Sequence, residues 1–229
     1  MSEAYQDSFG GRIGRMRHLL VARARAAGIR VGLVGYRPPV APSVEGWGEL
    51  YASGYYDYLG GLGELARYSL LDGYIRHLGG SPSILDLGCG SGILRERIAG
   101  AAFARYVGVD PAAAAIETAK RLEDDRTSFR VGDPDDLDLE PFDIVVANEV
   151  FYGVAEPSKL IGRAFELLRP GGHLLSSNFR HPGDRGLHRM LDERFELLDA
   201  VEARNLTGPG RRKRRWRVTC HRRPGEAAR

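Results

Sequence analysis

The stretch Ile84-Leu-Asp-Leu-Gly-Cys-Gly-Ser-Gly92 decides the fold. An apolar run ends in the carboxylate of Asp86, glycines follow at alternate positions, and a helical pattern begins directly after them. This order predicts a buried strand that turns through a tight loop into a helix. Glycine is needed where the backbone turns sharply or approaches a ligand too closely to leave room for a Cβ. We therefore expect the loop to hold a ligand against bare backbone.

A dinucleotide site is the first alternative for this loop. Its fingerprint is G-x-G-x-x-G, whereas this loop reads G-x-G-x-G and carries Ile93 where the third glycine belongs. Asp86 would also repel a pyrophosphate at the helix N-terminus. A ligand with a cationic centre fits better, which favours S-adenosylmethionine, since its sulfonium and ammonium groups are both positive.

The loop resembles motif I of the class I S-adenosylmethionine-dependent methyltransferases. Four later segments resemble the motifs that follow it in this family, in the right order and spacing: Val107-Gly-Val-Asp-Pro111, Val131-Gly-Asp133, Phe142-Asp-Ile-Val-Val-Ala-Asn-Glu-Val150 and Leu167-Leu-Arg-Pro-Gly-Gly-His-Leu-Leu175. The resemblance covers about residues 65 to 221. It implies an α/β, Rossmann-like fold with a seven-stranded, mostly parallel sheet, an antiparallel C-terminal hairpin and S-adenosyl-L-methionine as cofactor.

The chain of 229 residues suits one core with added segments. We expect a basic leader and linker over 1–46, a helical lid segment over 47–80 and the methyltransferase core over 81–229. In the lid segment, helical spacing predicts an apolar face made of Leu62, Leu65, Ala66, Leu70 and Tyr74.

Within the core, strands and helices alternate, which predicts βαβ units and a parallel sheet covered on both faces. The expected strands are 83–87, 105–109, 127–131, 142–147 and 172–178, and the expected helices are 92–99, 112–122 and 157–168. Two further strands, 195–203 and 214–221, flank a glycine- and proline-containing turn.

Several features indicate a cytoplasmic protein. No uninterrupted apolar run approaches the roughly 18 residues of a membrane span, and arginines interrupt 16–25 where a signal peptide needs an apolar core. Cys89 and Cys220 are read as free thiols in a reducing compartment. The oligomeric state stays open, with a homodimer as one option.

The basic run Arg211-Arg-Lys-Arg-Arg215 has two interpretations. It could bind phosphate or nucleic acid, or it could be a solvated turn beside an edge strand, where basic side chains discourage aggregation. We favour the solvated turn and do not expect nucleic acid as a partner.

Acidic residues lie at or just after the ends of successive predicted strands. In a parallel sheet, the carboxyl ends of the strands meet at one crevice. The resemblance implies that Asp110 binds the ribose hydroxyls, with capping of the next helix as the alternative. It also implies an adenine contact for Asp133, main-chain contacts at Gly88 and Gly90, and a backbone role rather than a side-chain role for Asn148 and Glu149. The expected cofactor-binding residues are Asp86, Gly88, Gly90, Asp110, Pro111, Asp133, Pro134, Asn148, Tyr58 and Arg67.

The expected catalytic base is His181 or Tyr152. Many relatives read roughly E-V-L-E-H-V where this chain reads Glu149-Val-Phe-Tyr-Gly-Val154, so Gly153 replaces the histidine and Tyr152 is the nearest substitute. His181 follows the fifth expected parallel strand on the acceptor side, and an ordinary imidazole can take a proton from a hydroxyl; a surface histidine is the alternative. No metal-ligand spacing such as HExxH or paired CxxC occurs.

The tyrosine cluster over 51–58 resembles the lid of small-molecule methyltransferases, and its rings could face a cationic sulfonium. We therefore expect methyl transfer to an oxygen or nitrogen of a small molecule, such as a sugar or another metabolite. Three alternatives stay open: an RNA or protein methyltransferase that uses the basic C-terminal region, a non-catalytic S-adenosylmethionine-binding protein, and a nicotinamide oxidoreductase.

Overall fold

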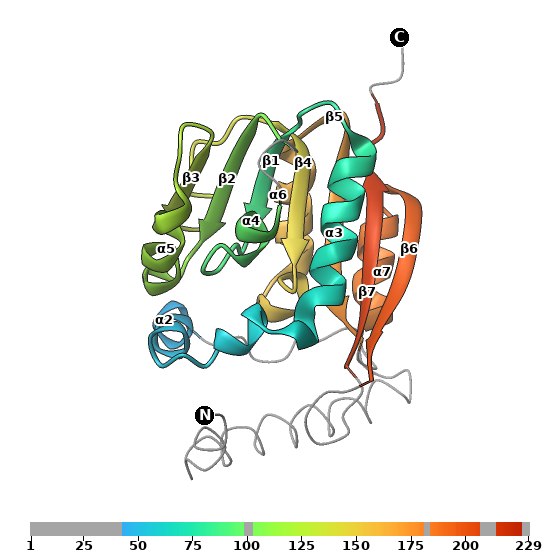
Figure 1. Ribbon diagram of the computed structural model, residues 1–229. Coiled ribbons are helices and arrows are strands. Elements are labelled where there is room, and N and C mark those ends of the chain that lie inside the picture. Colours follow the sequence, from blue (N-terminus) through green and yellow to red (C-terminus); the bar gives the residue numbers. More distant parts are fainter. Residues whose placement is uncertain (1–42, 99–102, 181–183, 207–213, 226–229) are drawn as a thin grey trace.

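The computed structural model describes residues 43–98, 103–180, 184–206 and 214–225 (Figure 1). Most of the expected leader over 1–46 and all of His181 lie outside these residues. Within them, no helix is long and apolar enough to cross a membrane.

One seven-stranded sheet forms the centre of the fold (Figure 1). Its strands run in the order β3-β2-β1-β4-β5-β7-β6, and β7 pairs antiparallel with both of its neighbours whereas all other pairs are parallel. The sequence prediction of a mostly parallel sheet with an antiparallel C-terminal hairpin is confirmed. The strands are β1 (Ser83–Leu87), β2 (Arg105–Asp110), β3 (Thr127–Val131), β4 (Phe142–Asn148), β5 (Leu168–Phe179), β6 (Glu196–Asn205) and β7 (Arg214–Arg222).

Helices cover both faces of the sheet and divide the core into two clusters (Figure 1). On one face, α3 (Leu65–Leu78), α4 (Ile93–Arg97) and α5 (Ala113–Ala119) pack on the side where β1 directs Ile84. On the other, α6 (Pro157–Glu166) and α7 (Asp184–Asp192) pack on the side where β1 directs Leu85 and Leu87. This alternation along β1 follows from the two-residue period of a strand.

The N-terminal part of the described chain is helical and irregular. It consists of α2 (Val44–Ala52) and the 3-10 turns η1 (Asp57–Gly60) and η2 (Leu62–Glu64), which lead into α3. Ser43 caps α2 by accepting a hydrogen bond from the N–H of Gly46 at 3.1 Å.

The apolar face predicted for the lid segment is confirmed only in part, since Leu70 and Tyr74 pack half-buried against the core but its other three residues are exposed. Leu62 is 84% exposed and Leu65 is 40% exposed, whereas Leu71 and Ile75 are fully buried. The buried face of α3 also contains Arg67, which finds polar partners described below. The spacing of apolar residues does not reveal that a charged residue such as Arg67 is buried. The face predicted from the sequence was therefore one position away from the buried face.

Two element boundaries and one additional helix also differ from expectation. The helix expected over 112–122 divides into α5 and the 3-10 turn η4 (Lys120–Leu122). Strand β5 begins at Leu168, because Leu168 pairs with Phe142 before a register shift. Helix α7 was not predicted at all.

The carboxyl ends of β1, β2 and β4 come together where the strand order reverses. Strand β1 pairs with β2 on one side and with β4 on the other. Ligands of open α/β sheets bind in the crevice outside the strand ends at such a reversal.

Candidate functional site

The glycine loop after β1 has a backbone that only glycine adopts easily. Gly88, Gly90 and Gly92 have φ values of +65°, +54° and +80°, in the left-handed region that L side chains disfavour. A Cβ on Gly90 would lie 2.4 Å from the hydroxyl oxygen of Tyr51, and one on Gly88 would lie 2.6 Å from Val150. The loop therefore exposes bare backbone to the crevice for both conformational and steric reasons.

Asp110 ends β2 and holds this loop. One carboxylate oxygen accepts from the N–H of Gly90 at 2.9 Å, and the other accepts from the N–H of Ala112 at 2.9 Å. Burial raises the pKa of Asp110, and these two donors oppose the rise. Because each carboxylate oxygen has two acceptor sites, one on each oxygen is left over for the hydroxyls of a ligand. Asp110 thus shapes the loop and retains the capacity that ribose binding requires.

Asp86 is an acid with unmet hydrogen-bonding capacity. It is 1% exposed and accepts a hydrogen bond from the Tyr106 hydroxyl at 2.5 Å, while its other oxygen has no hydrogen-bond partner in the described part of the chain. Burial raises the pKa of Asp86 to about 7, and the nearby charge of Asp110 adds to the rise. A cationic donor beside this oxygen would relieve both penalties.

A single cavity of about 460 Å³ joins these groups to the segment before β1. This volume is within the usual range of small-molecule sites. Nine of the residues expected from the sequence line it: Tyr58, Arg67, Asp86, Gly88, Gly90, Asp110, Pro111, Asn148 and Tyr152.

Two expected cofactor-binding residues, Asp133 and Pro134, do not line the cavity. Asp133 is exposed, and its carboxylate accepts from the N–H of Asp135 at 2.9 Å. The carbonyl of Pro134 accepts from Arg163 at 3.1 Å. Their contact with the cofactor, at the adenine in the case of Asp133, stays a prediction from the family resemblance.

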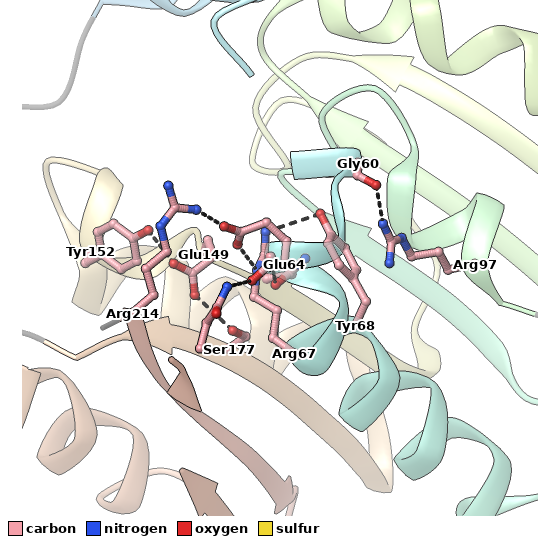
Figure 2. Close-up of polar contacts among 12 residues, drawn as sticks. Gly60, Glu64, Arg67, Tyr68, Arg97, Glu149, Tyr152, Ser177 and Arg214 are labelled. Atoms are coloured by element: carbon pink, nitrogen blue, oxygen red, sulfur yellow. Dashed lines mark hydrogen bonds and ion pairs between the residues drawn. The ribbon is translucent and has the colours of Figure 1, made fainter. Parts of the chain in front are cut away.

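Glu64 and two arginines form a buried ionic cluster at the start of α3 (Figure 2). Glu64 is 2% exposed; it accepts from Arg67 Nε at 3.0 Å and forms an ion pair with Arg214 of β7. Arg67 is 1% exposed and also donates to the side-chain oxygen of Asn148 and to the Tyr68 hydroxyl. The cluster therefore ties α3 to β4 and β7 around the cavity.

This cluster changes two expectations. Arg67 was expected to bind the cofactor, but its guanidinium already engages three protein groups; contact with the cofactor stays a prediction. Of the basic run, only Arg214 and Arg215 are described, and Arg214 lines the cavity with its guanidinium 4.8 Å from the Tyr58 ring centre. For Arg214, the interpretation as a solvated turn residue is wrong.

Glu149 lies directly after β4 and contributes a carboxylate to the cavity wall (Figure 2). One oxygen accepts from the Tyr152 hydroxyl at 2.6 Å and the other accepts from the Ser177 hydroxyl at 2.9 Å. Burial raises the pKa of Glu149, and the positive charge of Arg67 opposes the rise. The pKa of Tyr152 lies well above its ordinary value, because its hydroxyl is buried beside this carboxylate. Tyr152 is therefore a donor here, and sequence reasoning gave the side chain of Glu149 too little weight.

Aromatic side chains from α2 and the following turn form another wall. Trp47, Tyr51, Tyr55, Tyr56 and Tyr58 all line the cavity. The rings of Tyr51 and Tyr56 lie 4.7 Å apart, and those of Trp47 and Tyr56 lie 6.0 Å apart. Such ring faces attract cations and bind flat apolar groups. Among the described residues, no three His, Cys, Asp or Glu side chains gather as a metal site would require.

Comparison with known proteins identifies methyltransferases as the relatives of this chain. A family model described as a methyltransferase domain matches residues 80–214, more than half of the chain. The ubiquinone biosynthesis O-methyltransferase of Azorhizobium caulinodans is 40% identical over 99 residues, which are 41% of this chain and 39% of that protein. The same-named protein of Neisseria meningitidis is 29% identical over 140 residues, 57% of either chain. The matched regions thus span less than two thirds of these relatives.

Solved structures share the fold. The N-methyltransferase NodS of Bradyrhizobium japonicum in complex with S-adenosyl-L-homocysteine has a TM-score of 0.61 at 21% identity, covering 71% of this chain and 88% of that one. The [4+2]-cyclase SpnF has a TM-score of 0.63 at 19% identity, covering 82% and 99%. Since these identities are low, the two structures support the fold and not a particular acceptor.

Proposed function

The chain belongs to the class I S-adenosylmethionine-dependent methyltransferases, and on that basis we propose that it methylates a hydroxyl group of a small molecule. The observation that carries the proposal is one cavity that contains the glycine loop and Asp110 as well as the paired Glu149 and Tyr152, beneath an aromatic wall. A bound cofactor and an acceptor hydroxyl would share this space.

The residues present fit the cofactor. Asp110 offers spare acceptor capacity on each oxygen for ribose hydroxyls, and Gly88 and Gly90 offer backbone where a Cβ would not fit. The unsatisfied oxygen of Asp86 suits a cationic donor. When bound, S-adenosylmethionine supplies an activated methyl group on a good leaving group. The protein therefore needs mainly to align the acceptor and exclude water.

The acceptor end of the cavity supports a hydroxyl on a flat or apolar molecule. Glu149 and Tyr152 provide polar groups that can hold a hydroxyl, whereas the rings of Tyr58 and Phe179 provide apolar surface near Glu149. We propose that the segment over 47–80 acts as a lid on this end. The names of the O-methyltransferase relatives agree with oxygen as the acceptor atom.

The remaining sequence expectations belong to the same proposal. His181 stays a candidate base whose place lies outside the described residues. We also propose a cytoplasmic location, as expected from the sequence. The oligomeric state stays open between monomer and homodimer.

The test is to incubate the protein with methyl-labelled S-adenosylmethionine and a metabolite extract, with total RNA and with total protein in parallel. Asp110→Ala serves as the control for cofactor-dependent labelling. We expect label in a small molecule, in a methoxy group identified by mass spectrometry. Label confined to RNA or protein, or to nitrogen atoms, would contradict the proposal.

A further inference from the structure

Glu149 has a strained backbone at the cavity wall. Among the described residues, Ser81 and Glu149 are the non-glycine residues with positive φ, at +54° and +67°. Such a conformation costs about 1–3 kcal/mol and persists where the surroundings enforce it, often at functional sites. Ser81 lies in the turn before β1, whereas Glu149 lies where β4 meets the cavity.

The carboxylate of Glu149 is held by neighbours on two elements. Tyr152 of η5 (Phe151–Gly153) and Ser177 of β5 each donate to one of its oxygens, and the nearby backbone of Phe179 lowers its pKa. A carboxylate has about four acceptor sites, so it keeps capacity for a further donor from the cavity. A group fixed in this way is positioned in advance for a ligand.

Charged and ionisable groups of α3, η5 and η1 face Glu149. Arg67 of α3 lowers its pKa, burial raises it, and the latter effect is larger. The hydroxyls of Tyr152 and Tyr58 face it from η5 and η1, and the pKa values of both are raised, so they stay protonated near neutral pH. A carboxylate whose pKa is raised toward the working pH is a stronger base than an exposed one.

A purely structural role for Glu149 would need its backbone alone. The turn at Glu149 also brings Val150 against Gly88, where a Cβ would be 2.6 Å from the valine. That packing requires the turn but not the carboxylate. The two roles can therefore be separated by a variant that keeps the shape of the side chain and removes its basicity.

We propose that Glu149 is the general base of methyl transfer and that the acceptor is a phenolic hydroxyl, with Tyr152 and Ser177 as positioning residues. This inference rests on the proposed function. The O–H bond of the acceptor breaks and its proton moves to a carboxylate oxygen of Glu149. The acceptor oxygen bonds to the methyl carbon as the carbon–sulfur bond breaks, and that electron pair stays on sulfur.

The class of acceptor follows from matching acidities. A phenol has a pKa of about 10, whereas a hydroxyl resembling that of water is near 15.7. A carboxylate can therefore assist the loss of the phenol proton far more effectively than the loss of a proton from a water-like hydroxyl. The aromatic wall of the cavity also fits a flat ring.

The test compares Glu149→Gln with wild type in single turnovers at saturating S-adenosylmethionine, with catechol and 4-nitrocatechol as probes. The glutamine keeps the size of the side chain and one acceptor oxygen. Catechol must lose a proton during the reaction, so the variant should be about 10²–10⁴-fold slower. 4-Nitrocatechol is largely ionised already at the assay pH. With this probe, the variant should therefore be only a few-fold slower than wild type.

Two further readouts separate a base from a structural group. Affinity for S-adenosyl-L-homocysteine, measured by calorimetry, should change less than about threefold. In protein labelled with ¹³C-glutamate, the carboxyl signal that disappears in Glu149→Gln should titrate above the ordinary range of glutamate. Glu156→Gln is the matched control, since Glu156 is an exposed acid nearby that does not line the cavity, and it should leave both rates unchanged.

Each other outcome overturns the proposal in a distinguishable way. Full activity of Glu149→Gln on catechol, or an equal loss on both probes, removes Glu149 as the base while the proposed function stands. A wild-type protein that binds S-adenosylmethionine and methylates amines but neither phenol refutes the proposed function and the base together.

Discussion

Removal of the Glu64 carboxylate should destabilise the protein far more than removal of an exposed acid. In Glu64→Ala, the guanidinium of Arg67, which is 1% exposed, loses the carboxylate at 3.0 Å and keeps only neutral hydrogen-bond partners, with Glu149 as the remaining carboxylate that its charge reaches. Breaking one partner from a buried ion pair costs about 3–5 kcal/mol. For chains of 150–250 residues each kcal/mol shifts Tm by about 2–4 °C, so Tm should fall by roughly 6–20 °C.

The matched control is Glu196→Ala. Glu196 pairs with Arg222 at 2.5 Å, but the two side chains are 50% and 46% exposed. Exposed pairs contribute about 0–1 kcal/mol, so this variant should lose no more than about 4 °C.

The assay is thermal and urea unfolding of both variants, with Glu64→Gln as a milder change if Glu64→Ala does not fold. Arg67 also contacts Asn148 at the cavity, so affinity for S-adenosyl-L-homocysteine should fall together with stability in the Glu64 variants. Equal stability losses for Glu64→Ala and Glu196→Ala would refute the reasoning, because burial would then not determine how much an ion pair contributes to stability.

Three further predictions concern the cofactor end of the cavity. Asp110→Ala should weaken S-adenosylmethionine binding by about 2–4 kcal/mol, because acceptors for two ribose hydroxyls are lost and the N–H groups of Gly90 and Ala112 lose their partner; a folded variant with near-normal affinity in calorimetry would contradict this. Gly90→Val should reduce the thermal shift produced by S-adenosyl-L-homocysteine, since φ is +54° and a Cβ meets the Tyr51 hydroxyl; an unchanged shift would argue against a tight loop. Because burial raises the pKa of Asp86 to about 7, the folded state binds a proton that the unfolded state releases near pH 4, so wild type should lose stability as pH rises from about 4 to 7. Asp86→Asn should flatten that slope in urea unfolding at several pH values, and parallel slopes would rule out the buried acid as its source.

The parallel strands and the cofactor loop were predictable because their signals are local. Buried strands are short apolar runs, and the alternate glycines mark the loop that follows β1. Helix α7 was missed because Asp184–Asp192 is short, mostly polar and contains Gly186. Its burial depends on Leu187 and Leu191, which only the finished sheet can cover.

The ionic cluster and the strained acid were not predictable in this way. Glu64 and Arg214 are 150 positions apart in sequence, and charged residues are by default expected on the surface. No propensity indicates that Glu149 adopts a left-handed backbone, since packing around it imposes that conformation. The sequence therefore predicted which strand ends form the site, while the partners of each side chain required the fold.

The most direct test of the account is a crystal structure with S-adenosyl-L-homocysteine and catechol bound together. We expect the ribose hydroxyls on the carboxylate of Asp110 and one catechol oxygen about 2.6–3.2 Å from the carboxylate of Glu149, facing the sulfur atom. A ribose bound away from Asp110, or a catechol whose hydroxyls do not reach Glu149, would contradict it.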